Sequence, residues 1–300
     1  MASPASIAVI VNARSGTALG HPDIGTELRE LFHAAGQDAE IIALSDGQDP
    51  ADAARRASAR ASIVVAAGGD GTVNGVVTGM LESSAALGVL PLGTLNHFAR
   101  DLQIPSDLRE AIAVVAAGHL RRVDVGEVNG RFFVNNSSIG IYPSIVDARE
   151  ALRGQGYRKW PAMAIATLRI LRRYRGVRVS LEVDGRRRVW RTPFVFVGNN
   201  EYAIDGLQTG ARAGLDQGQL FVYLAPRIRP RDLPLLLVKA LLGRARQSGE
   251  FEILPATEVW IDVTTTRRLR VALDGEVAMM PTPLHYRIRA HGLCVVAPRA

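Results

Sequence analysis

Between residues 64 and 74 the chain reads Val64-Val65-Ala66-Ala67-Gly68-Gly69-Asp70-Gly71-Thr72-Val73-Asn74. The apolar run that ends at Ala67 is typical of a buried strand. After the turn, apolar residues recur at helical spacing, as Val73, Val76, Val77 and Met80. The segment therefore predicts a strand, a glycine-rich turn and a helix.

This turn has the chemistry of a phosphate site. Its glycines allow positive φ and let the backbone approach a ligand closely. The following helix offers free N–H groups and the positive end of its dipole, and both favour phosphate. Asp70 would repel a phosphate unless a metal ion lies between them, which indicates a nucleotide with Mg²⁺. A plain helix cap by Asp70 or Thr72 is the simpler alternative, but it does not account for the whole cluster of glycines.

The composition is that of a globular protein with room for two domains. The chain has 300 residues, of which 47% are hydrophobic and 22% charged. No apolar run approaches the length that crosses a bilayer, and the first residues lack the features of a signal peptide. The one cysteine, Cys294, excludes an internal disulfide. We therefore expect a cytoplasmic protein, with possible peripheral contact at the inner face of the membrane.

The net charge of +7 favours an anionic partner. Nucleic acid, a phosphorylated substrate and an acidic membrane surface all fit a basic chain. The basic residues are dispersed along the sequence, and no platform of aromatic residues for stacking bases is evident. We therefore expect no nucleic-acid partner.

The first part of the chain alternates strands and helices. Strands are expected at residues 7–11, 41–44, before the turn at 68, and at 87–90, with helices around Leu28 to Phe32, at 49–60 and at 107–117. This order predicts a parallel sheet with helices on both faces, and ligands bind beyond the carboxyl ends of such strands. Three polar loops are expected at that edge, at residues 12–16, 68–72 and 93–96.

Beyond residue 124 the pattern changes to consecutive strands. They are expected at residues 131–136, 177–183, 189–198, 219–224, 259–263, 269–273 and 285–289, with a hairpin turn at 183–186 and one helical pattern at 148–173. We therefore expect a first α/β domain at residues 1–125 and a second, antiparallel domain at residues 126–300.

Four stretches together resemble the diacylglycerol kinase catalytic-domain family of lipid kinases. They are Asn12-Ala13-Arg14-Ser15-Gly16, residues 68–74, Pro91 to Arg100, and Leu273-Asp274-Gly275-Glu276. The glycine turn alone also occurs in NAD kinases and phosphofructokinases, whereas the ordered set is much more specific.

The resemblance implies a fold and a function. The fold is a Rossmann-like nucleotide-binding α/β domain followed by an antiparallel β-sandwich, with the active site in the cleft between them. The function is transfer of the γ-phosphoryl group of ATP, with Mg²⁺, to a hydroxyl of a lipid such as diacylglycerol. We expect the enzyme to bind its lipid substrate at a membrane surface. We also expect it to be a monomer or a homodimer.

The resemblance also assigns roles to individual residues. Together with the edge loops, it gives the nucleotide contacts as Asn12, Ser45, Gly68, Gly69, Asp70, Gly71, Thr72, Val73, Asn74, Gly93, Thr94 and Asn96. Asp70 would act with the catalytic Mg²⁺. Asp274 matches the family's general base, with Glu276 beside it, and Asp124 matches a functional acidic position. The competing interpretation of Asp274 is a structural aspartate in a β-turn.

The sequence departs from the family at two places. His97 stands where the family often has an aspartate, so a carboxylate is lost there. Gln217 stands where a bacterial relative would offer a ligand to a structural Mg²⁺, so that site is absent unless Asp216 substitutes.

Two other functions compete with a lipid kinase. One is an NAD kinase-like enzyme that acts on a ribose hydroxyl, and the other is a non-catalytic lipid-binding protein of the same fold. Retention of Asp70 and Asp274 disfavours the second. Contact with a membrane could come from the apolar stretch 233–242 or the arginines between 169 and 175, although core packing and a solvated basic face explain these segments equally well.

Overall fold

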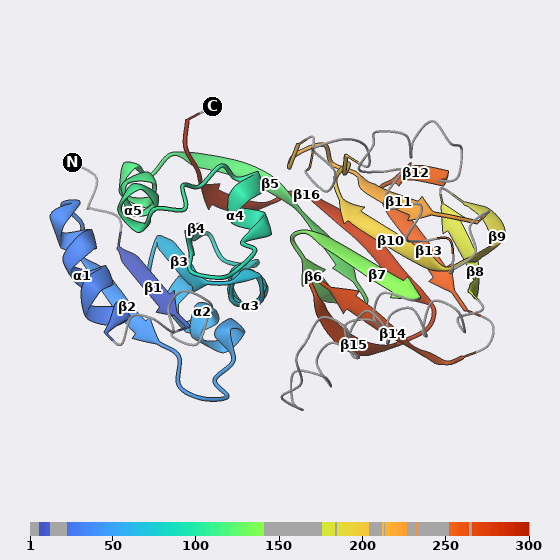
Figure 1. Cartoon of the computed structure of the whole chain (residues 1–300), viewed down its shortest axis with the longest axis horizontal. Helices are drawn as coiled ribbons and strands as arrows, with labels where there is room; N and C mark the ends of the chain where they lie inside the picture. The colour runs from blue at the N-terminus through green and yellow to red at the C-terminus, as the bar shows by residue number, and fades with distance from the viewer. Residues whose placement is uncertain are drawn as a thin grey trace. The chain divides into compact units, whose positions relative to one another are not determined.

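The computed structural model describes residues 6–12, 23–140, 176–183, 185–203, 212, 214–226, 232, 252–263 and 266–299. The chain divides into two compact units: Met1–Val125 with Ala290–Ala300, and Gly126–Arg289 (Figure 1). The sequence prediction placed everything after residue 125 in the second domain. The segment from Ala290 onward instead belongs to the first unit, because the end of β16 (Leu284–Val296) pairs with β4 through Val295 and Leu87.

The first unit is built on a parallel sheet. Its strands are β1 (Ile7–Val11), β2 (Ala39–Ala43), β3 (Ile63–Gly68) and β4 (Ala86–Pro91). They lie in the order β2-β1-β3-β4, with β16 next to β4, and each pair is parallel. All residues of β1 and β3 are buried, as a central strand covered on both faces requires.

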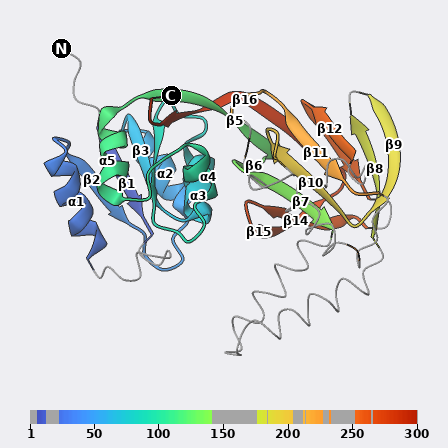
Figure 2. The same ribbon diagram turned by 45° about the horizontal axis from the view of Figure 1, so that its top comes forward.

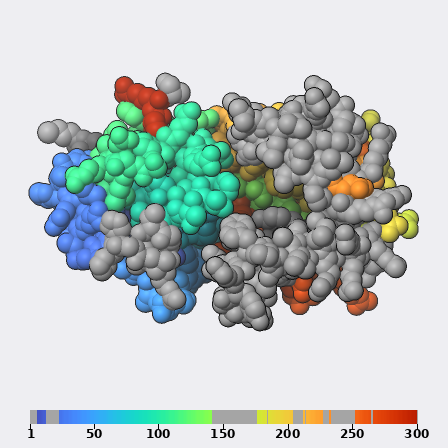
Figure 3. All heavy atoms as spheres, viewed as in Figure 1, coloured from blue at the N-terminus to red at the C-terminus, as the bar shows by residue number. Residues whose placement is uncertain are grey.

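Helices cover both faces of this sheet, as the alternating sequence pattern predicts. They are α1 (Ile24–Ala34), α2 (Pro50–Ser58), α3 (Asp70–Met80), α4 (His97–Asp101) and α5 (Leu108–Ala117). Helix α1 packs beside α5, and α2 packs beside α3, on opposite faces of the sheet (Figure 2). In the space-filling view, α4 and α5 form a continuous surface on the side toward the viewer (Figure 3).

The second unit is antiparallel. Its strands are β6 (Arg131–Phe133), β7 (Asn136–Gly140), β8 (Val177–Val183), β9 (Arg186–Thr192), β10 (Phe194–Asn199), β11 (Leu220–Leu224), β12 (Glu252–Ala256), β13 (Glu258–Asp262), β14 (Arg268–Leu273) and β15 (Glu276–Pro281), and β5 (Leu120–Val128) enters it from the first unit. One sheet has the order β12-β11-β10-β7-β14-β15, and a second layer has the order β16-β13-β8-β9. Their inner faces share one apolar cluster, so the layers form a sandwich.

Most expected strands are present, but in two places a stretch that was predicted as one strand forms two. The stretch 131–136 is divided into β6 and β7, because the N–H groups of residues 134–136 bind a side chain instead of a neighbouring strand. The stretch 189–198 is divided at Pro193, which has no N–H to donate. Strands β5, β12 and β15 were not predicted.

Several expectations fall outside the described residues. They are the helix at 148–173, the arginines between 169 and 175, the apolar stretch 233–242 and most of the loop 12–16. Within the described residues, no helix is both long enough and apolar enough to cross a membrane.

Candidate active site

The glycine turn leaves the amino end of α3 open to a ligand. The helix begins at Asp70 after Gly69, and this N-cap glycine has no side chain that could accept a hydrogen bond from the first turn. Helices α1, α2 and α5 differ, because the aspartates that precede them, Asp23, Asp49 and Asp107, each accept a hydrogen bond from a first-turn N–H. Uncapped N–H groups at the positive end of a helix favour an anion.

The loops after β3 and β4 touch through their backbones. A Cβ atom on Gly93 would lie 2.4 Å from the Cα of Gly69, so no larger residue fits there without a shift of the backbone. Asn96 holds the second loop in place: its Oδ1 accepts from the Gly93 N–H at 2.9 Å, and its Nδ2 donates to the Gly93 carbonyl at 2.8 Å. The result is a narrow backbone cradle at the carboxyl edge of the sheet.

Asn12 connects the loop after β1 to this cradle. Its Nδ2 donates to Oγ1 of Thr72 at 3.2 Å, and its own N–H donates to the Ala67 carbonyl at 3.0 Å. Thr72 is buried, and a Cβ on Gly68 would lie only 2.5 Å from its hydroxyl oxygen. Gly68 is therefore the residue that makes room for Thr72, and three strand ends meet as the sequence predicts.

Asp70 offers one carboxylate oxygen for further bonding. Its Oδ1 accepts from the backbone N–H of Phe98 in α4 at 3.3 Å. Oδ2 has no hydrogen-bond partner within the described part of the chain. Further along α3, Oδ1 of Asn74 is buried and accepts no hydrogen bond from the described residues. A nucleotide with Mg²⁺ suits this edge, since carboxylate and amide oxygens are ligands that Mg²⁺ accepts and the cradle suits phosphate.

The other expected nucleotide contacts differ in their surroundings. Ser45 binds within its own loop, where its N–H and its hydroxyl both donate to Oε1 of Gln48, at 3.2 and 3.1 Å. Thr94 is exposed, Gly71 is partly exposed, and Val73 packs in the core. The Val73 side chain is therefore not available to a ligand, and a nucleotide contact at this position would use its backbone.

Asp274 lies in the second unit, in the turn between β14 and β15. It has a positive φ of 46°, and its carboxylate accepts three consecutive backbone N–H groups. Oδ2 accepts from Val134 at 2.8 Å, and Oδ1 accepts from Asn135 and Asn136, each at 2.9 Å. Its own N–H donates to the Asn136 carbonyl at 2.9 Å. Asp274 therefore has a structural role, because these hydrogen bonds join its turn to residues 134–136.

Burial raises the pKa of Asp274 to about 6, although the three N–H donors and the charge of Arg212 oppose the rise. A carboxyl group with a pKa near 6 is ionised in most molecules at neutral pH and is basic enough to take a proton. This combination suits a general base.

The remaining acidic residues are divided between the units. Asp124 is buried in β5 of the first unit, where its Oδ1 accepts from the His291 N–H at 2.7 Å. Glu276 is exposed on β15 of the second unit. Asp70 and Asp124 thus belong to one unit and Asp274 and Glu276 to the other, and their assembly in one cleft stays a prediction.

Asp216, the alternative ligand for a structural Mg²⁺, belongs to no acidic cluster within the described part of the chain. Asp216 is exposed, and the described residues contain no group of three histidine, cysteine, aspartate or glutamate side chains able to hold a metal. Gln217 serves the loop instead: its Oε1 accepts from the Glu201 N–H at 3.0 Å, and its own N–H donates to Oδ1 of Asn200 at 2.9 Å.

The sequence analysis did not predict two clusters of polar and charged side chains. One joins buried Glu127 to Arg287 and Arg289, at 2.7 and 2.8 Å. The other surrounds Arg212 and includes asparagines of two Asn-Asn pairs, 135–136 and 199–200. The second cluster had a signal, because each pair lies at a strand end in the β-rich half.

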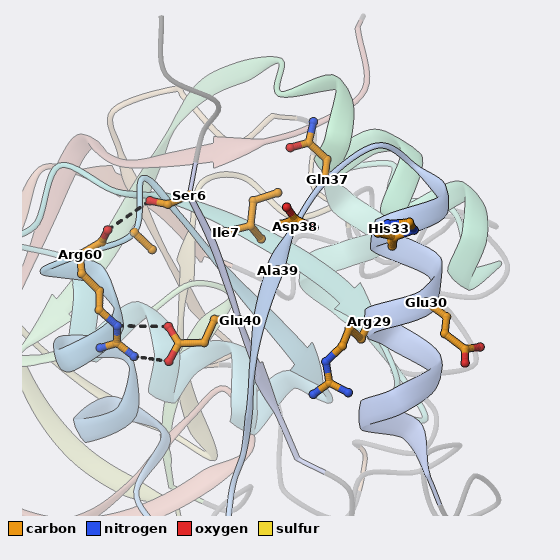
Figure 4. A pocket seen from close by; sticks show the side chains of 11 residues that line it. Ser6, Ile7, Arg29, Glu30, His33, Gln37, Asp38, Ala39, Glu40 and Arg60 are labelled. Atoms are coloured by element: carbon orange, nitrogen blue, oxygen red, sulfur yellow. Dashed lines mark hydrogen bonds and ion pairs between the residues drawn. The ribbon is translucent and has the colours of Figure 1, made fainter.

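A cavity of about 840 Å³ lies at the opposite edge of the first sheet. It is lined by residues before β1, β2 and β3 and by α1. Arg60 and Glu40 face each other there and form two hydrogen bonds, of 3.1 and 2.6 Å (Figure 4). Because ligands of such sheets bind beyond the carboxyl ends of the strands, the cradle is the better candidate site.

Comparisons with known proteins agree with the two types of domain in the fold. A family model described as the diacylglycerol kinase catalytic domain matches residues 6–128, and one described as the YegS C-terminal NAD kinase β-sandwich-like domain matches residues 145–297. A diacylglycerol kinase from Staphylococcus aureus (strain JH9) is 26% identical over 89% of this chain and 85% of its own. One from Staphylococcus saprophyticus is 36% identical over 134 residues, 44% of each chain.

A solved structure supports the fold. It comes from Bacillus anthracis str. Sterne, is described as a candidate diacylglycerol kinase, and superimposes with a TM-score of 0.80 at 22% identity. The match covers 99% of this chain and 97% of that one. Both expected domain types are therefore present.

Proposed function

This chain belongs to the diacylglycerol kinase catalytic-domain family, a family of lipid kinases, and from that premise we propose the reaction that it performs. It transfers the γ-phosphoryl group of ATP, with Mg²⁺, to a hydroxyl group of diacylglycerol or a related lipid alcohol. The lipid is reached at a membrane surface, and the enzyme works as a monomer or a homodimer.

The observation that carries the proposal is the cradle at the amino end of α3. The first turn of this helix lacks the side-chain cap that α1, α2 and α5 have, and the backbones of Gly69 and Gly93 meet beside it. N–H groups of the glycine turn would hold the phosphates, and the free oxygen of Asp70 would hold the metal. When bound, ATP supplies the γ-phosphoryl group, and Mg²⁺ neutralises the charge of the triphosphate.

Asp274 is the group that we assign to the acceptor hydroxyl. A carboxylate has about four lone-pair sites, and three of those on Asp274 are filled by the N–H groups of residues 134–136. The remaining site on Oδ2 would accept the proton of the lipid hydroxyl while the hydroxyl oxygen bonds to the γ-phosphorus, the bond from that phosphorus to the bridging oxygen breaks, and ADP leaves. Phosphoryl transfer asks little more of a protein than positioning, charge neutralisation and this proton acceptor.

The test is phosphoryl transfer from [γ-³²P]ATP. The purified chain is incubated with Mg²⁺ and mixed micelles of single lipids that carry a free hydroxyl, including diacylglycerol, and the lipid extract is separated by chromatography. We expect labelled phospholipid with at least one lipid, and none when EDTA removes Mg²⁺. Labelled NADP from NAD, with no labelled lipid, would instead favour the NAD kinase-like function. Absence of transfer to any acceptor, with lipid binding retained, would favour a non-catalytic lipid-binding protein.

A further inference from the structure

Arg212 lies at the centre of a polar network in the second unit. Its Nη1 donates to the carbonyl of Val134 at 2.6 Å and to the carbonyl of Asn199 at 3.3 Å, and its Nη2 donates to Oδ1 of Asn135 at 3.1 Å. Asn199, which is also buried, donates from Nδ2 to the same Val134 carbonyl at 2.9 Å. Two donors thus converge on one carbonyl oxygen.

That carbonyl belongs to the peptide group that also holds Asp274. The peptide between Val134 and Asn135 has its C=O and its N–H on opposite sides, because it is planar and trans. The C=O side receives Arg212 and Asn199, and the N–H side donates to Oδ1 of Asp274 at 2.9 Å. One rigid group therefore connects the guanidinium to the carboxylate.

The connection has two physical effects. A cationic donor on the carbonyl polarises the peptide and strengthens the hydrogen bond that its N–H donates. The same contacts fix the backbone of residues 134–136, where β6 ends and β7 begins, in the conformation that presents three N–H groups to Asp274.

We propose that Arg212 is a positioning residue, which holds the Asp274 carboxylate in its reactive orientation through the peptide between Val134 and Asn135. The consequence for catalysis rests on the proposed function, because it requires Asp274 to accept the proton of the lipid hydroxyl. This role requires no contact between Arg212 and the substrate or the nucleotide.

The electrostatics agree with the geometry. Among the described charged groups, Arg212 is the one that lowers the pKa of Asp274, against the larger effect of burial. Loss of this guanidinium removes both the charge and the donor behind the peptide. The carboxyl group then holds its proton to a higher pH, and a smaller fraction of the enzyme has the base ready near neutral pH.

The test compares Arg212→Met, Arg212→Lys and a matched control, Arg268→Met. Arg268 is an exposed arginine of β14 in the same unit. Two properties are measured in each variant: the titration of the Asp274 carboxyl, by ¹³C NMR of aspartate-labelled protein, and kcat for lipid phosphorylation against pH. Loss of a resonance in Asp274→Asn identifies the Asp274 signal.

For Arg212→Met we expect the Asp274 titration and the acid limb of kcat to move to higher pH by roughly one unit. We also expect kcat at pH 7 to fall roughly tenfold while KM for ATP stays close to the wild-type value. Arg212→Lys keeps the positive charge, so its Asp274 carboxyl should titrate nearly as in the wild type. Its kcat should be only partly restored, because lysine lacks the planar guanidinium that donates two hydrogen bonds side by side. Arg268→Met should match the wild type.

Coincident NMR titrations and kcat profiles for wild type and folded Arg212→Met would overturn the inference. If Arg212→Met does not fold, the test rests on Arg212→Lys. A kcat of Arg212→Lys equal to that of the wild type then overturns the inference. If the wild-type chain phosphorylates no lipid, the proposed function fails, and the NMR titrations alone then decide whether Arg212 acts on Asp274.

Discussion

The carboxylate of Asp70 accepts the backbone N–H of Phe98 at 3.3 Å, so the acidic residue of the glycine turn also holds the first turn of α4. This contact brings the loop after β4 to the amino end of α3. It uses Oδ1 and leaves Oδ2 for a metal ion. A substitution at Asp70 can therefore act on two properties, stability and catalysis, which must be separated.

Asp70→Asn and Asp70→Ala separate these two tasks. Asparagine keeps an oxygen that can accept from Phe98, but a neutral amide oxygen attracts Mg²⁺ much more weakly than a carboxylate does. We expect both variants to lose turnover, and only Asp70→Ala to lose stability, by about 1 kcal/mol, as for a lost cap. Urea denaturation and the lipid kinase assay are the measurements. Turnover at the wild-type rate in Asp70→Asn would remove the carboxylate from the mechanism.

Gly93→Ala tests the contact between the two glycine loops. Its Cβ would lie 2.4 Å from the Cα of Gly69, so one of the two loops must move. Displacing a binding group by about 1 Å can cost a hundredfold in rate, and we expect a loss of that order in kcat/KM for ATP. Gly25→Ala in α1 is the control, because among the described residues its Cβ would meet Ile41 alone, at an ordinary contact distance of 3.7 Å. We expect that variant to be active and more stable by about 0.5–1 kcal/mol.

Asp274→Asn should lower stability as well as kcat. An amide has one acceptor oxygen, whereas the carboxylate accepts N–H groups of Val134, Asn135 and Asn136 on two oxygens. The Asn variant therefore leaves at least one buried N–H without an acceptor, at a cost of about 1–3 kcal/mol. We expect kcat to fall by about 10²–10⁴-fold in the folded protein. Loss of stability with an unchanged rate per folded molecule would make Asp274 purely structural.

The pH dependence of stability offers an independent check on Asp274. Its pKa rises from 3.8 to about 6 in the folded chain because of burial, so the folded state binds this proton more tightly than the unfolded state. The contribution of this carboxyl to stability is therefore complete below about pH 4 and is lost as the pH rises through about 6. Urea denaturation of wild type and Asp274→Asn across this range should show that the free energy of unfolding of the wild type decreases relative to that of the variant as the pH rises. Parallel curves would contradict it.

The two arginines beside Glu127 should stabilise the fold cooperatively, because either one can balance the charge of the buried carboxylate. Its side chain is 6% exposed, while those of Arg287 and Arg289 are 50% and 38% exposed. One arginine can still balance the carboxylate, whereas the double variant Arg287→Met/Arg289→Met leaves a buried charge alone, at a cost of about 3–5 kcal/mol. We expect the double variant to lose more stability than the two single variants combined. Additive losses in a double-mutant cycle would show that the arginines act separately.

Local patterns predicted much of the fold. The run Ile7–Val11 is a strand with the expected bounds, because it is short, apolar and wholly buried. The helix expected at 107–117 begins after its Asp107 cap and ends at Gly118, which has a positive φ of 65°. In such segments the residues that set the ends lie within the segment itself.

Long-range contacts limited the prediction elsewhere. The end of β6 and the start of β7 depend on Asp274, about 140 positions away in the chain, so no local pattern near residue 134 reveals the break. The return of β16 to the first unit depends likewise on its pairing with β4. At the site, the glycine turn and Asp274 carried recognisable motifs. The Asn-Asn pairs at 135–136 and 199–200 were a signal for the second cluster, but no local pattern identifies Arg212 as the residue that they contact.

Binding of ATP to the cradle is the claim on which the rest depends. It is tested most directly by titrating the ¹⁵N-labelled chain with a non-hydrolysable ATP analogue and Mg²⁺ and following backbone amide signals by NMR. We predict the largest shifts at Gly69, Asp70, Gly71 and Thr72, and at Thr94 in the adjoining loop, with the amides of Ser6, Gln37 and Arg60 around the amino-edge cavity unchanged. Shifts confined to that cavity, or none at saturating analogue, would contradict the account.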